Sequence, residues 1–254
     1  MAATPFNELE RGFYKSTAGV LFVLGLIGFL GKVNLYGISL FVSRILVAQM
    51  EVGFYFLFLT FFALYLYSLW SERVVFRARV FSYSLLLGVA GLCISAQAFH
   101  QSPFWSVETV LYPLSFILSS LMLGGVTVGM LIGHWYLIDT GQSIDPFVRL
   151  FKFFLFSLIS QTGFLVLMPF LLYLMGSATT ASHLQGLWES HFLLLSARLL
   201  TAQVFPLVLS YMIWETLKIP HTMAATGLFY IALLGVFVGE ILGREILALT
   251  SLPF

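Results

Sequence analysis

The chain has 254 residues, of which 60% are hydrophobic and only 9% are charged, and its mean hydropathy is +0.99. Soluble domains carry roughly a quarter charged residues, so this composition excludes an ordinary water-soluble fold. The formal net charge of +1 includes no basic cluster or charged tail, which argues against nucleic-acid binding. A single cysteine, Cys93, excludes an internal disulfide and a thiolate metal site.

Apolar stretches long enough to cross a bilayer recur along the whole chain. About 20 apolar residues of helix are enough to span the hydrocarbon core. We therefore predict an all-α, polytopic transmembrane helical bundle that forms a single transmembrane domain over residues 1–254. The seven predicted spans run approximately over residues 16–31, 53–70, 80–99, 109–138, 148–175, 191–217 and 223–249.

Residues 33–50 are open to two interpretations. Apolar side chains such as Ile38, Phe41 and Ile45 fall on one helical face, which Ser39 and Arg44 avoid. This pattern favours an interfacial amphipathic helix over an eighth span.

Lys and Arg residues near the span ends predict the orientation of the bundle. If segment 1–15 is cytoplasmic, eight of these residues lie inside: Arg11, Lys15, Arg73, Arg77, Arg79, Arg149, Lys152 and Lys218. Only Lys32 and Arg44 lie outside, and the connections 100–108 and 176–190 contain no Lys or Arg. Because cytoplasmic loops carry an excess of Lys and Arg, we predict that the N-terminus lies inside and the C-terminus outside.

Two of the predicted spans contain glycines at every fourth position. They are Gly125, Gly129 and Gly133 in the fourth span and Gly235, Gly239 and Gly243 in the seventh. Small residues at this spacing let helix backbones approach closely. We predict tight packing within the bundle, and a face for a flat ligand is the alternative.

Charged side chains lie inside two of the last spans, in the half that we place outside. Glu240 and Arg244 are four residues apart, so they can pair along one helix, and Arg198 lies at a comparable depth. Charges within a membrane are costly and normally face the bundle interior, a water cavity or a functional site. Both a structural ion pair and a pocket lined by these residues fit the pattern.

The histidines divide between the two predicted faces of the membrane. His100 and His191 lie at outer span ends, and His134 and His221 at inner ones. Two histidines on each face could ligate two b-type haems, although polar residues are also common at span ends. The sequence contains no phosphate loop, HExxH, CxxC or nucleophile elbow, so we assign no catalytic residue and no metal site.

The stretch GEILGR (239–244) resembles the last helix of the dimethyl sulfoxide reductase membrane-anchor family, one of the polysulfide-reductase-like quinol-handling anchors. Three more stretches are similar to that family in the same order: AFHQSP (98–103), YPLSFILSSLMLGG (112–125) and SARLL (196–200). The resemblance covers only the C-terminal part of the chain. The family usually has eight spans, and about two are missing here between His100 and Pro113.

This resemblance implies a membrane anchor subunit that exchanges electrons between a quinone (menaquinone or ubiquinone) and an iron–sulfur partner subunit. A molybdenum-type catalytic subunit would complete the complex, in the cytoplasmic membrane of a bacterium or archaeon. By position, His100 would contact the quinol and accept its proton, while Arg198, Glu240 and Arg244 would line or brace the same pocket. Two alternatives stay open: a di-haem b-type cytochrome subunit and a non-catalytic structural or assembly subunit.

Overall fold

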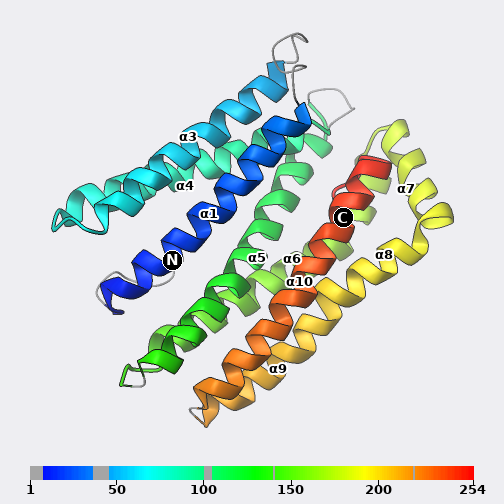
Figure 1. Cartoon of the computed structure of the whole chain (residues 1–254). Helices are drawn as coiled ribbons and strands as arrows, with labels where there is room; N and C mark the ends of the chain where they lie inside the picture. Colours follow the sequence, from blue (N-terminus) through cyan, green and yellow to red (C-terminus); the bar gives the residue numbers. More distant parts are fainter. Residues whose placement is uncertain (1–7, 37–45, 100–104, 140, 220) are drawn as a thin grey trace. The chain divides into compact units, whose positions relative to one another are not determined.

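The computed structural model describes residues 8–36, 46–99, 105–139, 141–219 and 221–254. Within these ranges the chain is helical and contains no strand. The helices are α1 (Arg11–Tyr36), α3 (Leu46–Ser68), α4 (Val74–Gln97), α5 (Glu108–Ile138), α6 (Asp145–Met175), α7 (Ala178–Ser190), α8 (Phe192–Leu199), η1 (Leu200–Val204), α9 (Phe205–Lys218) and α10 (Thr222–Thr250) (Figure 1).

Seven helical segments in the described ranges are long and apolar enough to cross a membrane. Six are the single helices α1, α3, α4, α5, α6 and α10. The seventh, Phe192–Lys218, is built from α8, η1 and α9 in succession. The prediction of an all-α bundle with seven spans is confirmed, and the orientation of its termini stays a prediction.

Half of the predicted interfacial segment, residues 37–45, lies outside the described residues. Residues 33–36 form the end of α1, and residues 46–50 form the first turns of α3. Both flanking helices are therefore longer than the spans predicted at 16–31 and 53–70.

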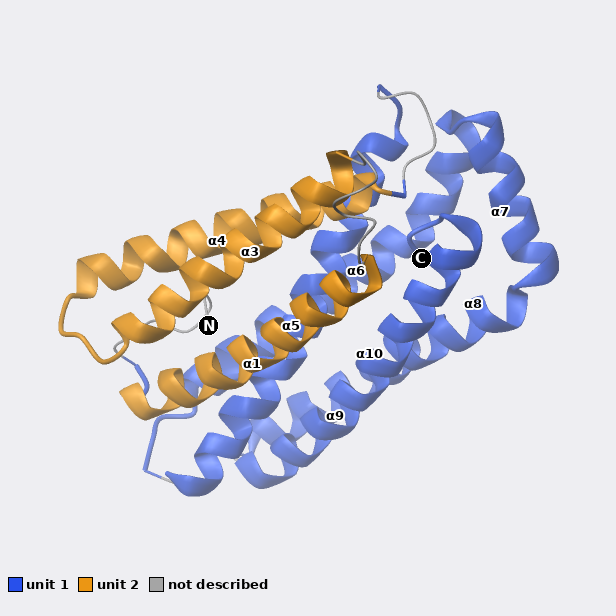
Figure 2. Cartoon of the chain, turned by 45° about the horizontal axis from the view of Figure 1, so that its top comes forward, with its two compact units in different colours: residues 1–9, 99–254 blue, residues 10–98 orange. Residues whose placement is uncertain are grey.

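The chain forms two compact units, one of residues 10–98 and one of residues 1–9 with 99–254 (Figure 2). The prediction of a single transmembrane domain stays a prediction. The smaller unit contains α1, α3 and α4, and aromatic side chains one turn apart on α3 fill its centre. Phe58 stacks on Phe62, and Phe62 on Tyr65, with 5.8 Å between ring centroids in both pairs.

In the larger unit, α10 packs against α5 on one side and against α8, η1 and α9 on the other (Figure 1). Most glycines of the two series lie at these contacts, and Gly125 lies against Phe153 and Phe154 of α6. A Cβ on Gly133 would be 2.5 Å from Thr226 Oγ1 of α10, and one on Gly235 would be 2.9 Å from the carbonyl oxygen of Thr201 in η1. At Gly239 a Cβ would collide with Ala202 of η1. The prediction that the glycines allow close helix packing is confirmed.

The seventh span contains a π-helical turn that the sequence did not predict. Phe205 N–H donates to the carbonyl of Leu200, five residues earlier, which is the bond that defines a π-helix. Pro206 follows at once and has no N–H to continue the α-helical pattern. The turn begins directly after α8 ends, two residues beyond Arg198, and such turns are frequent at functional sites.

Candidate functional site

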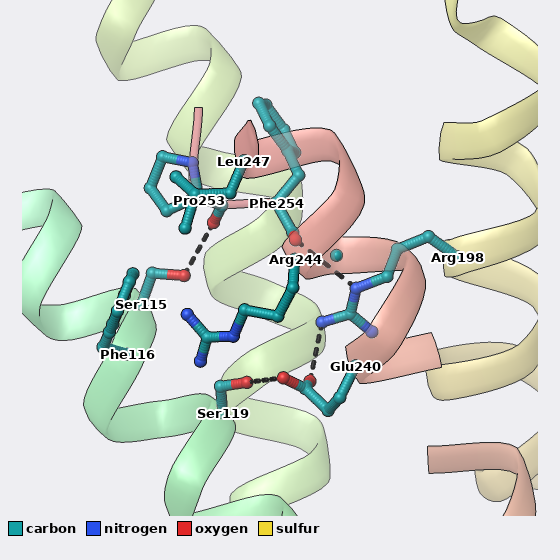
Figure 3. Close-up of a pocket in the computed structure, with 10 residues that line it drawn as sticks. Ser115, Phe116, Ser119, Arg198, Glu240, Arg244, Leu247, Pro253 and Phe254 are labelled. Atoms are coloured by element: carbon teal, nitrogen blue, oxygen red, sulfur yellow. Dashed lines mark hydrogen bonds and ion pairs between the residues drawn. The ribbon is translucent and has the colours of Figure 1, made fainter. Parts of the chain in front are cut away.

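A small polar pocket lies inside the larger unit, where α5, α8, α10 and the segment after α10 meet (Figure 3). Its volume is about 10 Å³, which is room for about one water molecule. It is lined by Ser115, Phe116, Ser119, Arg198, Glu240, Gly243, Arg244, Leu247, Pro253 and Phe254.

Arg198, in the last turn of α8, is the most deeply buried charged group of the pocket. Only 1% of the residue is exposed, and its Nη2 donates to Glu240 Oε1 at 2.8 Å. Its Nε donates to the main-chain oxygen of Phe254 over a longer distance of 3.4 Å. Its Nη1 is buried and has no hydrogen-bond partner within the part of the chain that the structure describes. A buried guanidinium with a spare donor is costly, so this atom is suited to a ligand oxygen or a water.

Glu240 joins three helices through its two carboxylate oxygens. Oε1 accepts from Arg198, and Oε2 accepts from the hydroxyl of Ser119 on α5. Its side chain is 12% exposed. The carboxylate therefore balances the charge of Arg198 and ties α5, α8 and α10 together at one depth.

Arg244 does not use the pairing along α10 that its spacing from Glu240 allows. Among the residues described, no ion pair joins these two side chains, because Glu240 pairs with Arg198 instead. The guanidinium of Arg244 points toward α5, and its Cζ lies 4.2 Å from the centroid of the Phe116 ring (Figure 3). A cation over an aromatic face is stabilised by the ring quadrupole. This arrangement leaves the N–H groups of Arg244 available to an acceptor.

The segment after α10 folds back over the pocket. Ser251 ends the helix in the left-handed conformation, with φ of 56°, and its N–H donates to Leu247 O at 2.8 Å. Ser115 Oγ then donates to the carbonyl oxygen of Pro253 at 2.7 Å. Gly243 makes room for this return, because a Cβ there would be 2.6 Å from Phe254 O and 2.7 Å from Arg198 Nε.

The structure thus brings together three of the four residues predicted for a quinone site, namely Arg198, Glu240 and Arg244. The fourth, His100, lies outside the described residues. Their role in binding a quinone stays a prediction.

The other three histidines predicted as haem ligands lie near the ends of helices. His134 on α5 has its Nδ1 3.2 Å from the hydroxyl of Tyr230 on α10. His191 lies between α7 and α8, and His221 directly precedes α10. Across the described ranges, no group of three or more His, Cys, Asp and Glu side chains is placed to hold a metal ion. Haem ligation by these histidines stays a prediction.

Ser115 and Ser119 supply hydroxyl groups to the pocket from α5 and were not predicted as site residues. Their spacing of four residues places them on one helical face, so this signal was present in the sequence. That Pro253 and Phe254 line the pocket was also not predicted. Nothing in these last residues predicts that their backbone returns to the bundle.

A second buried carboxylate, Glu51, lies in the smaller unit and was also missed. It is 3% exposed and accepts from Lys32 Nζ of α1, from Ser95 Oγ of α4 and, at 2.6 Å, from Tyr36 OH. The cluster forms where α1 ends, α3 begins and α4 ends. The sequence does contain a signal for this cluster, because Lys32 and Glu51 are opposite charges on either side of residues 33–50.

Comparisons of the chain with protein-family models, with curated proteins and with solved structures gave no match. A proposal about function therefore depends on the chemistry of the pocket and on the resemblance of its short stretches to the anchor family.

Proposed function

We propose that this multi-pass membrane protein is a quinone-interacting anchor subunit of an oxidoreductase that contains several subunits. In this proposal it exchanges electrons between menaquinone or ubiquinone and an iron–sulfur partner subunit. The observation that carries the proposal is the pocket that Arg198, Glu240 and Arg244 line together from α8 and α10.

The donors of the pocket suit a quinone headgroup. Such a headgroup has two carbonyl oxygens, and within the membrane no bulk water is present to supply hydrogen bonds to them. Arg198 Nη1 and the guanidinium of Arg244 are donors that have no hydrogen-bond acceptor among the described residues. Phe116 adds an aromatic surface beside them.

Glu240 is the proposed proton carrier of the pocket. Oxidation of a quinol releases two electrons and two protons, and reduction of a quinone takes up the same number. The Ser119 hydroxyl and the Arg198 guanidinium hold the Glu240 carboxylate beside the pocket. A carboxylate placed in this way can accept a proton from a quinol hydroxyl or return one. His100 would serve as the outer acceptor.

The remaining parts of the proposal come from the anchor-family resemblance. The iron–sulfur subunit and a molybdenum-type catalytic subunit would dock on the outer face of a bacterial or archaeal cytoplasmic membrane. The N-terminus would lie inside, in agreement with the distribution of Lys and Arg. Purification of the complex from its native membrane and identification of the partner chains tests these points.

The proposed site is tested directly by the binding of a quinol analogue to the purified protein. A hydroxyquinoline N-oxide, whose fluorescence is quenched on binding, reports the Kd in detergent. We expect Arg244→Ala to raise the Kd about tenfold, the effect of losing one charged hydrogen bond. Lys218→Ala is the matched control, because Lys218 pairs with Glu215 on an exposed surface of α9. Equal Kd values for both variants and the wild type would exclude the pocket as the binding site.

A second candidate function is that of a non-catalytic structural or assembly subunit. One observation favours it: both oxygens of Glu240 already have protein donors, and the remaining volume is about 10 Å³. In that case the network only joins helices, and no quinol analogue binds.

An absorption spectrum of the same preparation tests the di-haem alternative, because reduced b-type haem gives a sharp visible band.

A further inference from the structure

The last described residues of the chain are buried in the pocket although they are not helical. After the left-handed turn at Ser251, Leu252 is fully buried and Phe254 is 6% exposed. Pro253 between them lines the pocket, as Phe254 does. These residues occupy volume that would otherwise belong to the cavity.

The backbone of this segment uses the hydrogen-bond donors of the pocket. Two consecutive main-chain oxygens enter it: Pro253 O accepts from Ser115 Oγ at 2.7 Å, and Phe254 O accepts from Arg198 Nε at 3.4 Å (Figure 3). The two donors come from different helices, α5 and α8. A quinone headgroup also presents two acceptor oxygens, the carbonyl oxygens of its ring.

We propose that residues 252–254 are an exchangeable internal occupant of the headgroup site, and that Ser115 and Arg198 are the donor pair that a quinone takes over from them. This inference rests on the proposed quinone-binding function. It adds Ser115 to the site and explains why the pocket is closed to anything larger than about one water in this state.

The contacts of the segment are compatible with exchange. Ser115 and Arg198 each donate one hydrogen bond to the segment, and the bond from Arg198 is near the upper limit of length and is therefore weak. The segment is joined to α10 through Ser251, and a residue at the end of an element is where a hinge usually lies. Gly243 leaves the floor of the site without a side chain, so either the segment or a ligand can approach α10 closely.

Binding of the hydroxyquinoline N-oxide to variants of the protein tests this inference. We expect a chain ended after Ser251 to bind the analogue at least about tenfold more tightly than the wild type, because the competitor is gone. Adding Ser115→Ala to the shortened chain should weaken binding again. Leu249→Ala is the control, since Leu249 is 53% exposed at the same end of α10 and does not line the pocket.

The outcomes separate the two proposals. Equal affinity of the wild type and the shortened chain would overturn the inference and leave the proposed function in place. Absence of binding by both, with both folded by circular dichroism, would overturn the proposed function and the inference with it.

A second measurement uses the unaltered protein, in case the shortened chain does not fold. Leu252 N–H donates to Thr250 Oγ1 at 3.3 Å, and Phe254 N–H donates to Leu252 O at 3.0 Å. We expect hydrogen exchange of both amides to become faster when the analogue binds. Unchanged exchange at a saturating concentration of bound analogue would show that the segment stays in place and would overturn the inference.

Discussion

Each of the two units contains a carboxylate that pairs with a cation between helices, but the two carboxylates are satisfied differently. In the smaller unit, Glu51 receives three donors, and its cation, Lys32, keeps 27% of its side chain exposed. In the larger unit, Glu240 pairs with Arg198, whose side chain is 2% exposed and whose Nη1 has no acceptor among the described residues. A cluster that satisfies its carboxylate braces helices, whereas a buried donor beside a cavity is suited to a ligand.

Removal of each carboxylate should give the largest difference between the units. We expect Glu240→Ala to lower the free energy of unfolding by about 3–5 kcal/mol, because Arg198 would be left as an uncompensated buried charge. Glu51→Ala should cost about 1–3 kcal/mol, because the partly exposed Lys32 can turn its ammonium group toward water. Denaturant titration in detergent micelles measures both. A larger loss for Glu51→Ala would reverse the comparison.

Removal of one serine from each network sharpens the comparison. Ser119→Ala takes away the donor to Glu240 Oε2, and we expect a loss of about 1.5–3 kcal/mol, as for a hydrogen bond to a charged group. Ser95→Ala should cost only about 0.5–1.5 kcal/mol, because Lys32 and Tyr36 still donate to Glu51. The same titration applies, and equal losses would mean that the Glu51 network is no better satisfied than the Glu240 network.

Glycine substitution compares close packing at the pocket with open space in the smaller unit. We expect Gly243→Ala to cost about 1–3 kcal/mol, because the new methyl would press on Phe254 O and Arg198 Nε. Gly19→Ala in α1 is the control: no atom lies within 4 Å of its added Cβ, so the higher helix propensity of alanine should leave stability equal or slightly raised. A neutral Gly243→Ala would show that the segment after α10 is held loosely.

The smallest effect is expected at the exposed pair of Arg11 and Glu72 in the smaller unit. Arg11 donates two hydrogen bonds to Glu72, at 2.7 and 2.8 Å, and these bonds together with its charge lower the pKa of the Glu72 carboxyl. A carboxyl with a lowered folded-state pKa stabilises the fold above its unfolded pKa of about 4.3, and this contribution is lost as the pH falls through the folded value.

We expect Glu72→Gln to remove this small acid dependence from thermal unfolding in detergent. High salt should have a similar effect on the wild type, because the pair is exposed. If the difference in stability between the wild type and the variant is the same at every pH, the pair contributes no acid-dependent stability.

Sequence reasoning predicted the spans and part of the pocket because both depend on local signals. Runs of apolar residues marked all seven spans, and rare charges within them marked Arg198, Glu240 and Arg244. That these residues lie close together was also expected, because charged side chains inside a membrane are energetically costly and normally pair with one another. The pairing along α10 that the spacing allows does not form among the described residues, because Glu240 pairs with Arg198 on α8.

The missed features depend on contacts between segments far apart in the chain. Glu51 is satisfied by Lys32 and Ser95 only because the ends of α1 and α4 lie beside the start of α3. The return of Pro253 to Ser115 joins residues 138 positions apart and has no periodicity that could reveal it. Pro206 can be read from the sequence as an interruption of the span, but nothing in the sequence reveals the π-turn that precedes it.

That π-turn determines which way the buried cation faces. It places one surplus residue between Arg198 and Pro206, within Leu200–Val204, a stretch that has no charged side chain. Were these residues to rewind as ordinary α-helix, α8 would rotate by about 100° relative to α9, the angle of one residue. The guanidinium would then swing away from Glu240. A change of winding in five uncharged residues can therefore disconnect the ion network without breaking the span.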